Sequence, residues 1–120
     1  MTRATEGSLG QFEQQTAMAL LALGGEAYGL QIYDKMCETS KKRVNLGGMY
    51  VTLSRLEKKG YLSAKDEPGS QARGGKARRF YKLEKPGVKA LRETADTGAR
   101  LAEMFYSLWS SRWRPKRAEE

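Results

Sequence analysis

The chain has 120 residues, of which 22 are Lys or Arg and 14 are Asp or Glu, so its formal net charge at pH 7 is +8. This length fits one domain with a modest core, to which an oligomer interface can add stability. Histidine is absent and Cys37 is the only cysteine, which excludes an internal disulfide and removes the usual member of metal sites and catalytic triads. The composition therefore favours a binding protein over an enzyme, and we expect neither a metal nor another cofactor.

The chain shows no targeting or membrane signal. Its longest uninterrupted apolar run, 17–23, has seven residues, which is too short to cross a bilayer. The N-terminal stretch MTRATEGS lacks the apolar core of a signal peptide. A cytoplasmic protein without a membrane partner is expected. For Cys37, the helical context favours a buried, unreactive thiol over a redox switch.

The excess positive charge is confined to one segment. Residues 41–82 contain twelve Lys and Arg against three Asp and Glu, a net of +9, whereas the other 78 residues have a net charge of −1. Such a cluster binds a polyanion by releasing condensed counterions, so the affinity falls with salt. A merely solubilising surface is the alternative, but it does not usually confine the imbalance to one segment.

Two helices are predicted ahead of this segment. Residues 1–7 are expected to form a loose arm, after which Ser8 and Gln11 have the spacing of a capping box. Apolar residues at helical spacing then continue to Gly24, and a second helix fits 27–37.

The start of the second helix allows two interpretations. Gly29 lets the backbone approach a neighbouring segment or a phosphate closely, whereas Tyr28 also fits a packed core tyrosine. Residues 38–44 form a polar, basic connection to the next helix. The second and third helices are therefore predicted to make a helix-turn-helix pair.

The third helix is predicted between Asn45, which can cap its first turn, and Gly60, which can end it in the left-handed conformation. Four apolar residues recur at 3,4,3 spacing, so we assign their shared face to the core. They are Leu46, Met49, Leu53 and Leu56. Small and cationic residues fall mostly on another face: Gly48, Val51, Thr52, Arg55, Lys58 and Lys59.

A β-hairpin is predicted next. Residues 61–66 alternate partly and residues 77–83 are rich in aromatic and basic side chains, as strands often are. Pro68-Gly69 and Gly74-Gly75 are turn formers, so we expect antiparallel strands joined by a mobile loop that carries Arg73. A helix followed by a basic-tipped hairpin is typical of a winged helix.

From Lys85 onward the pattern is helical again for more than twenty residues. A helix this long projects beyond a small domain, and a second copy of the chain is the economical cover for its apolar stripe. We predict a dimerisation helix over 85–113 and a tail over 114–120, disordered beyond Pro115. The predicted interface residues here are Val88, Leu91, Ala95, Gly98, Leu101, Ala102, Phe105, Leu108 and Trp109. Trp109 and Trp113 fit interface packing, with a small-molecule effector pocket between subunits as the alternative.

Four segments together carry a family resemblance. They are LGQFEQQTAMALLAL (9–23), AYGLQIYDKM (27–36), VNLGGMYVTLSRLEKKGYL (44–62) and ARGGKARRFYKLEKPG (72–87). In this order and at this spacing the sequence resembles the PadR-like transcriptional regulators. The resemblance implies a mainly α fold with a small β-hairpin, in which a winged helix-turn-helix domain over 8–84 precedes the dimerisation helix. It also implies a dimeric DNA-binding transcription factor, usually a repressor, in which Leu9 and Phe12 of the first helix assist the dimer.

Candidate DNA-binding residues come from two sources. The resemblance places one set near DNA, in the third helix and at the wing tip: Gly47, Tyr50, Thr52, Arg73, Gly74 and Gly75. Chemistry and position add a second set: Asn45, Gly48, Val51, Arg55, Lys76, Arg78 and Arg79. Gly48, a second glycine in the first turn, indicates either close approach to DNA or fraying.

Side-chain chemistry suggests a division of labour among these residues. Tyr50 and Thr52 can donate to phosphates, whereas Asn45 suits adenine. Arg55 suits guanine, Val51 or Thr52 suits a thymine methyl, and Arg73 suits a narrow minor groove. For Arg78 and Arg79, pairing with Asp66 or Glu67 is the alternative to DNA contact. The family's Thr or Ser after the final wing strand is Glu84 here, which predicts a weaker cap for the last helix.

The predicted function is a sequence-specific transcriptional regulator that binds an inverted-repeat operator as a homodimer, with two reading helices about 34 Å apart. A winged-helix interaction module or adaptor with an acidic protein partner is the alternative, although it has no need for Arg73 at a glycine-flanked tip. An RNA binder is disfavoured, because the third helix is a rigid, groove-sized element and not a platform of stacking aromatics.

Overall fold

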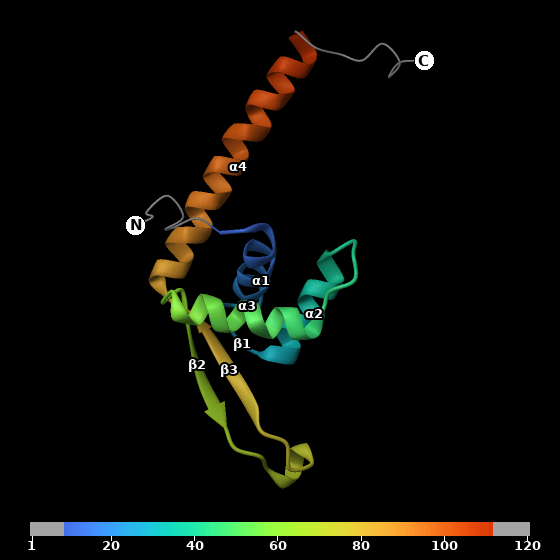
Figure 1. The fold of residues 1–120 in the computed structure, drawn as a ribbon, viewed down its shortest axis with the longest axis vertical. Coiled ribbons are helices and arrows are strands. Elements are labelled where there is room, and N and C mark those ends of the chain that lie inside the picture. The colour runs from blue at the N-terminus through green and yellow to red at the C-terminus, as the bar shows by residue number, and fades with distance from the viewer. Residues whose placement is uncertain (1–8, 112–120) are drawn as a thin grey trace.

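The computed structural model describes residues 9–111, which form a small helical domain with a protruding hairpin and a long final helix (Figure 1). The elements in this range are α1 (Gln11–Ala22), β1 (Glu26–Tyr28), α2 (Gly29–Thr39), α3 (Leu46–Lys58), β2 (Leu62–Glu67), the 3-10 turn η2 (Gln71–Arg73), β3 (Arg78–Leu83) and α4 (Lys85–Ser111). The predicted arm 1–7, Trp113 and the predicted tail 114–120 lie outside the described residues.

The core lies where α1, α2 and α3 meet (Figure 1). Its fully buried large side chains are Leu20, Ile32, Met36, Met49, Leu53 and Leu56, together with Thr16. The apolar face predicted for α3 is therefore confirmed for three of its four residues. Leu46 is the exception, at 39% exposed, because it occupies the first turn of α3, which the core does not cover.

Both predicted ends of α3 are confirmed. Asn45 is the N-cap, and its side-chain oxygen accepts a hydrogen bond from the backbone N–H of Gly48. Gly60 takes the left-handed conformation directly after the helix, with φ of 81°. These two residues fix where the helix starts and where the chain turns into the hairpin.

The capping box predicted at Ser8 and Gln11 is wrong, because Gly10 is the N-cap and Gln11 is already the first helical residue. Glu13 closes the turn instead, accepting the N–H of Gly10 at 2.9 Å. Glu13 also accepts a hydrogen bond from the Lys59 ammonium at 3.0 Å, which ties α1 to the end of α3. The side chain of Glu13 is only 12% exposed.

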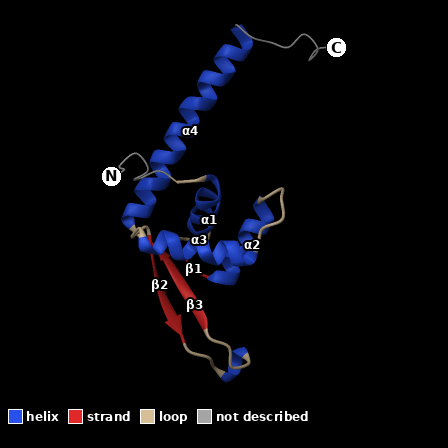
Figure 2. Ribbon diagram, viewed as in Figure 1, coloured by secondary structure: helices blue, strands red, loops and turns tan. Residues whose placement is uncertain are grey.

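The sheet has three antiparallel strands in the order β1-β3-β2 (Figure 2). The predicted hairpin is confirmed as β2 and β3, but β1 was missed and its residues were partly assigned to the second helix. With three residues, β1 is too short to show a period, and it is stabilised by pairing Ala27 with Tyr81 and Tyr28 with Phe80. As a result α2 begins at Gly29, two residues later than predicted.

The first two turns of α4 belong to the domain, and the remainder projects away from it (Figure 1). Ala90 and Leu91 are buried in the domain core. At Gly87, an added Cβ would overlap the backbone oxygen of Tyr61, so the helix start approaches β2 more closely than another residue permits. Ser63 of β2 also donates its hydroxyl to the Glu84 carboxylate at 2.6 Å, beside the start of α4.

Two further findings concern chemistry. Cys37 is exposed, so the buried thiol predicted from its helical context is wrong. Its position is one residue after the buried Met36, which turns it away from the core. Among residues 9–111, no helix is both long and apolar enough to span a bilayer.

Candidate nucleic-acid interface

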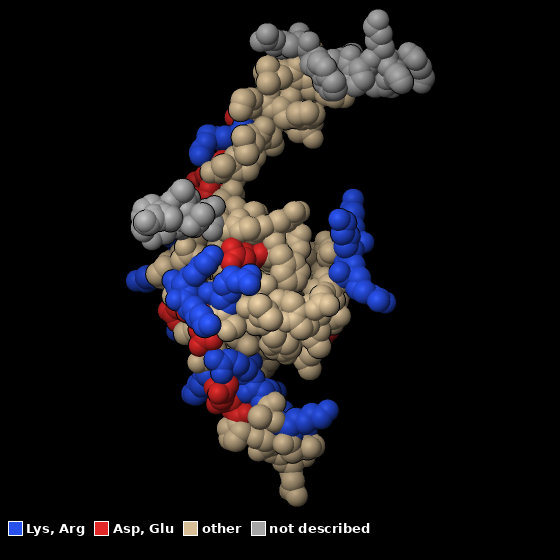
Figure 3. Space-filling view, viewed as in Figure 1, with Lys and Arg blue, Asp and Glu red and all other residues tan. Residues whose placement is uncertain are grey.

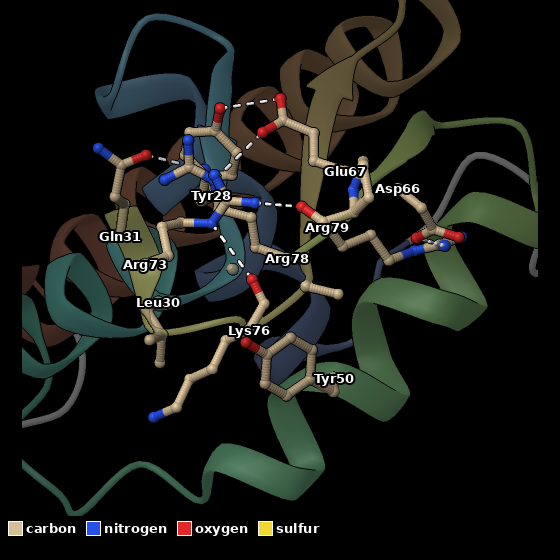
Figure 4. Close-up of a pocket in the computed structure, with 13 residues that line it drawn as sticks. Tyr28, Leu30, Gln31, Tyr50, Asp66, Glu67, Arg73, Lys76, Arg78 and Arg79 are labelled. Atoms are coloured by element: carbon tan, nitrogen blue, oxygen red, sulfur yellow. Dashed lines mark hydrogen bonds and ion pairs between the residues drawn. The ribbon is translucent and has the colours of Figure 1, made fainter. Parts of the chain in front are cut away.

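A groove of about 1020 Å³ lies between the hairpin and the helices (Figure 4). We call the hairpin from β2 to β3, with the loop between them, the wing, and this hollow the wing groove. It is lined by the N-cap and first turn of α2 (Tyr28, Gly29, Leu30 and Gln31), by Tyr50 of α3, and by Asp66, Glu67, Pro68, Arg73, Lys76, Ala77, Arg78 and Arg79 of the wing. The groove thus joins three elements that lie far apart in the sequence.

The outer face of α3 carries part of the predicted site. Val51 and Arg55 are exposed, and with Tyr50, Ser54 and Lys58 they line a second, smaller hollow. Thr52 was assigned to this face wrongly, since its side chain is 5% exposed. Thr52 follows Met49 by three residues and precedes Leu56 by four, so helical geometry places it on the core face.

A close contact within the protein explains one of the two glycines in the first turn of α3. Asn45 and Gly47 are exposed, while Gly48 is half-buried beneath the capping side chain. A Cβ on Gly48 would lie 3.2 Å from the Asn45 side-chain oxygen, tighter than ordinary contact. The neighbour that Gly48 admits closely is therefore the Asn45 cap, which gives this glycine a role without DNA and without fraying.

Arg79 connects both wing strands to α3. Its guanidinium donates to both oxygens of Glu57 on α3, at 3.0 and 3.2 Å, and to Asp66 on β2 (Figure 4 shows the contact with Asp66). Glu57 first and Asp66 second raise the pKa of Arg79 further above its ordinary value. For Arg79 the pairing alternative from the sequence is confirmed, with Glu57 as a partner that sequence reasoning missed.

Arg78 and Tyr28 form a second connection, on the other side of the wing (Figure 4). The Arg78 guanidinium lies 3.7 Å above the Tyr28 ring and donates to Glu67 at 3.2 Å, and the Tyr28 hydroxyl donates to Glu67 at 3.0 Å. The hydrogen bond from Tyr28, followed by that from Arg78, holds the pKa of Glu67 below its usual range. Tyr28 is half-buried against the wing, with an edge-on contact to Phe80, so it is not a core tyrosine.

The wing tip is more ordered in its contacts than the glycine-rich sequence suggests. Gly74 and Gly75 have φ of 70° and 80°, values that favour glycine, and they follow the turn η2. Arg73 folds back to donate to the backbone oxygens of Lys76, at 3.3 Å, and Pro68. Arg73 therefore closes the loop. Lys76 is exposed, and its ammonium has no ion pair within the described part of the chain.

Lys and Arg gather on the wing, at the end of α3 and on the connection between α2 and α3 (Figure 3). The connection contributes three exposed cations in succession, Lys41, Lys42 and Arg43. Acidic side chains interrupt the positive surface in the outer half of the wing strands, where Asp66 and Glu67 pair with the two arginines. The unpaired positive charge is thus displaced toward the wing tip and the outer face of α3.

The residues predicted for dimerisation separate into two groups. Leu9 and Leu91 are 6% and 4% exposed within the chain's own core, so assigning them to an interface was wrong. Phe12 is half-buried and packs against that core. The exposed group is Val88, Ala95, Gly98, Leu101, Ala102, Phe105 and Leu108. Trp109 is half-buried, and its ring centroid lies 5.6 Å from that of Phe105.

Comparison with known proteins identifies the family. The model of the transcriptional regulator PadR-like family matches residues 18–93, which is more than half of the chain. Among solved structures, a PadR family transcriptional regulator from Eggerthella lenta has a TM-score of 0.64 at 21% identity, covering 82% of this chain and 86% of that one. One from Clostridium difficile has a TM-score of 0.64 at 20% identity, covering 82% of this chain and 98% of that one.

The same fold occurs in a structure that contains DNA. The ORC1 protein of Aeropyrum pernix in complex with DNA has a TM-score of 0.60 at 21% identity, and the match covers 82% of this chain and 27% of that one. No curated protein matches the chain. The predicted winged helix-turn-helix with a long C-terminal helix is confirmed by the structure and its PadR neighbours. The chain belongs to the PadR-like family of transcriptional regulators.

Proposed function

We propose that this chain is a homodimeric repressor that binds an inverted-repeat DNA operator with α3 in the major groove and the wing on the flanking backbone or minor groove. The observation that carries the proposal is the arrangement of exposed cations. Arg55 and Lys58 on α3 and Lys76 on the wing are exposed and border the two hollows that meet at Tyr50. A row of cations on a rigid helix beside a hairpin suits a duplex, whose phosphates flank its groove.

On α3, position and chemistry support distinct roles. Val51 and Arg55 project from the outer face, where an apolar side chain can meet a thymine methyl and a guanidinium can pair with guanine. Asn45 and Gly47 lie at the helix start, where backbone N–H groups favour a phosphate. Tyr50, beside the wing groove, can donate its hydroxyl to the backbone of the DNA.

On the wing, Lys76 is the stronger candidate for phosphate contact because its ammonium is exposed and unpaired among the described residues. Arg73, Gly74 and Gly75 shape the tip that presents it. Arg73 can still contribute its charge, since hydrogen bonds to neutral carbonyls leave the guanidinium positive. The wing therefore supplies charge at its tip and a defined loop shape.

The projecting part of α4 supports the homodimer. Leu101 and Phe105 are 57% and 50% exposed, and exposed Leu108 continues their stripe. An amphipathic helix of this length with an uncovered apolar stripe requires a partner surface. In a two-fold dimer, pairing of α4 with its copy would hold two α3 helices apart at a fixed spacing, which matches an inverted repeat.

Fluorescence anisotropy tests the proposal. Labelled DNA from upstream of the chain's own gene is titrated at several salt concentrations against a scrambled duplex and an RNA hairpin. A regulator should bind the upstream DNA at physiological salt about a thousandfold or more tighter than the scrambled duplex. If the chain bound all three nucleic acids equally and in a salt-sensitive way, a basic surface alone would explain the binding, and the proposal would be wrong.

A protein-interaction module is the second candidate. The observation that favours it is the folded-back Arg73, whose contacts with two loop carbonyls give this arginine a use that needs no DNA. The same titration separates the candidates, because absence of binding to every nucleic acid would support the interaction module.

A further inference from the structure

We propose that Arg79 is a positioning residue, which sets the angle between the wing and α3 through Glu57 and Asp66 and does not itself contact DNA. The inference rests on the proposed function, because the angle matters when α3 and the wing bind one duplex together. The three residues thus act in recognition by orienting the wing. Neither the charge of Arg79 nor its location in the wing indicates this role.

The geometry favours a fixed joint between the wing and α3, by which we mean the contacts of Arg79 with Glu57 and Asp66. Arg79 lies on β3, Asp66 is its partner across the hairpin on β2, and Glu57 lies in the last turn of α3. The guanidinium contacts all three elements, with two donor contacts to Glu57 at 3.0 and 3.2 Å. A planar guanidinium held from two sides has a defined orientation, which a single ion pair between flexible chains does not provide.

The wing needs such a joint because its outer half has only two strands. The partners of β1 on β3 end at Phe80, so Arg78 and Arg79 pair with β2 alone. An isolated two-stranded hairpin is marginal in water. Side-chain contacts replace the missing third strand: Arg78 stacks on Tyr28 on one side, and Arg79 reaches Glu57 on the other.

The distribution of acids supports a structural use of these charges. Residues 41–82 contain three acids, Glu57, Asp66 and Glu67, and each pairs with Arg78 or Arg79. An unpaired acid beside a bound duplex would repel the phosphates and lower the affinity. All three acids of the basic segment are therefore placed where they hold the wing.

A change in Glu57 distinguishes the joint from a simple charge effect. Glu57→Gln removes a negative charge near the DNA-binding surface, so electrostatics alone predicts tighter binding. If Glu57 and Arg79 position the wing, binding weakens, by roughly three- to thirtyfold for a lost coupling between neighbouring charged groups. The measurement is anisotropy with the duplex that the wild type binds. Glu93→Gln, at an exposed position on α4, is the charge-matched control and should change affinity little.

A second variant tests Arg79 at constant charge. Arg79→Lys keeps the positive charge but loses the planar donors, so it should weaken binding as Glu57→Gln does, with the salt slope unchanged. Because the two changes break the same joint, the double variant should be no weaker than either single one. Unchanged or tighter binding by Glu57→Gln, or losses that add in the double variant, would overturn the inference.

A readout without DNA keeps the inference testable if the proposed function fails. Two exposed positions receive spin labels through cysteine substitutions, Ser54→Cys on α3 and Gln71→Cys on the wing, in a Cys37→Ser background. The labelled chain is then diluted with unlabelled chain. The distance distribution measured by double electron–electron resonance should be narrow in the otherwise wild-type chain and in Glu93→Gln, and broad in Glu57→Gln. Equal widths would overturn the inference, whereas a broadened distribution without any DNA binding would overturn the proposed function alone.

Discussion

The phenol ring of Tyr50 lies directly against the backbone of Gly29, so closely that a Cβ built on Gly29 would fall 2.6 Å from the Tyr50 hydroxyl oxygen. Gly29 begins α2 and Tyr50 lies one turn into α3. The φ of Gly29 is not positive, so the absence of a side chain, and not backbone freedom, makes glycine necessary here. Gly29 therefore lets Tyr50 pack across the floor of the wing groove.

Gly29→Ala should displace Tyr50 and weaken DNA binding while leaving the fold intact. The alanine is compatible with the helix, and the group it meets is the end of a movable side chain, so the free energy of unfolding should change by less than about 1 kcal/mol. Affinity for the duplex should fall about as far as in Tyr50→Ala, and the double variant should be no weaker. Losses that add would show that Gly29 and Tyr50 act separately.

Asn45 should contribute to stability and to recognition in separable ways. Asn45→Ala loses the hydrogen bond to the Gly48 N–H and should lower the free energy of unfolding by about 1 kcal/mol. Asn45→Asp keeps a capping oxygen and adds a negative charge, so it should retain stability but bind DNA more weakly. Chemical denaturation and anisotropy on the same samples measure the two effects. Equal DNA affinity in wild type and Asn45→Asp would place Asn45 away from the phosphates.

The sequence predicted the fold well where one residue decides the local structure. Asn45 and Gly60 gave the bounds of α3, and the glycines at 74 and 75 gave the wing turn. The prediction from sequence failed where pairing with a distant segment determines the local structure. The strand β1 is stabilised by β3, more than fifty residues away, and no local pattern over three residues reveals that pairing.

The site was predicted less completely, because burial and pairing are set by neighbours distant in sequence. Thr52 shares the polarity of a surface residue but lies on the core face of α3. Glu57 carries a repulsive charge in a DNA-binding segment until Arg79 of β3 is seen beside it. The spacing of Thr52 from Met49 and Leu56, which were already assigned to the core, could have placed Thr52 correctly, whereas the contact between Glu57 and Arg79 required the fold.

Lys76 and Arg73 should respond differently to removal. Lys76→Ala removes an exposed, unpaired charge. The slope of log affinity against log salt should therefore become less negative by roughly 0.9, the value for one phosphate contact. Arg73→Ala should also flatten the salt dependence and in addition loosen the loop, because it loses the bonds to the carbonyls of Lys76 and Pro68. Hydrogen exchange of the loop amides, faster in Arg73→Ala only, distinguishes them. If neither change altered the salt slope, the wing tip would not belong to the DNA interface.

Glu13 should make stability depend on pH. Burial raises its pKa, but the hydrogen bonds from Gly10 and Lys59 outweigh this and leave the pKa below the ordinary value. A lowered folded-state pKa contributes stability above the unfolded value, and this contribution is lost as the pH falls through the folded value. Glu13→Gln should therefore be less stable than wild type by about 1 kcal/mol at neutral pH, with the difference vanishing in acid below about pH 4. A difference that is constant with pH, measured by urea unfolding, would contradict the assignment.

Phe105 should be central to self-association, because it lies on the exposed stripe of α4 and contacts both Tyr106 and Trp109. Phe105→Glu places a charge in the predicted helix pair, where desolvation without a partner is costly, so sedimentation should show monomers. Thr97→Glu is the matched control, since Thr97 is exposed and accepts a hydrogen bond from Arg100, whose charge can pair with the new carboxylate. This control should remain dimeric.

The same Phe105 variant connects assembly to DNA binding. A monomer has one reading helix, so Phe105→Glu should lose most of its affinity for an inverted repeat but keep its weak affinity for a single half-site. The domain itself should keep its helical content, because Phe105 lies on the projecting part of α4, well beyond Ala90 and Leu91, which are buried in the core. If Phe105→Glu sediments as an intact dimer, the interface lies elsewhere, and the exposed Met18 and Leu21 of α1 would be the next residues to change.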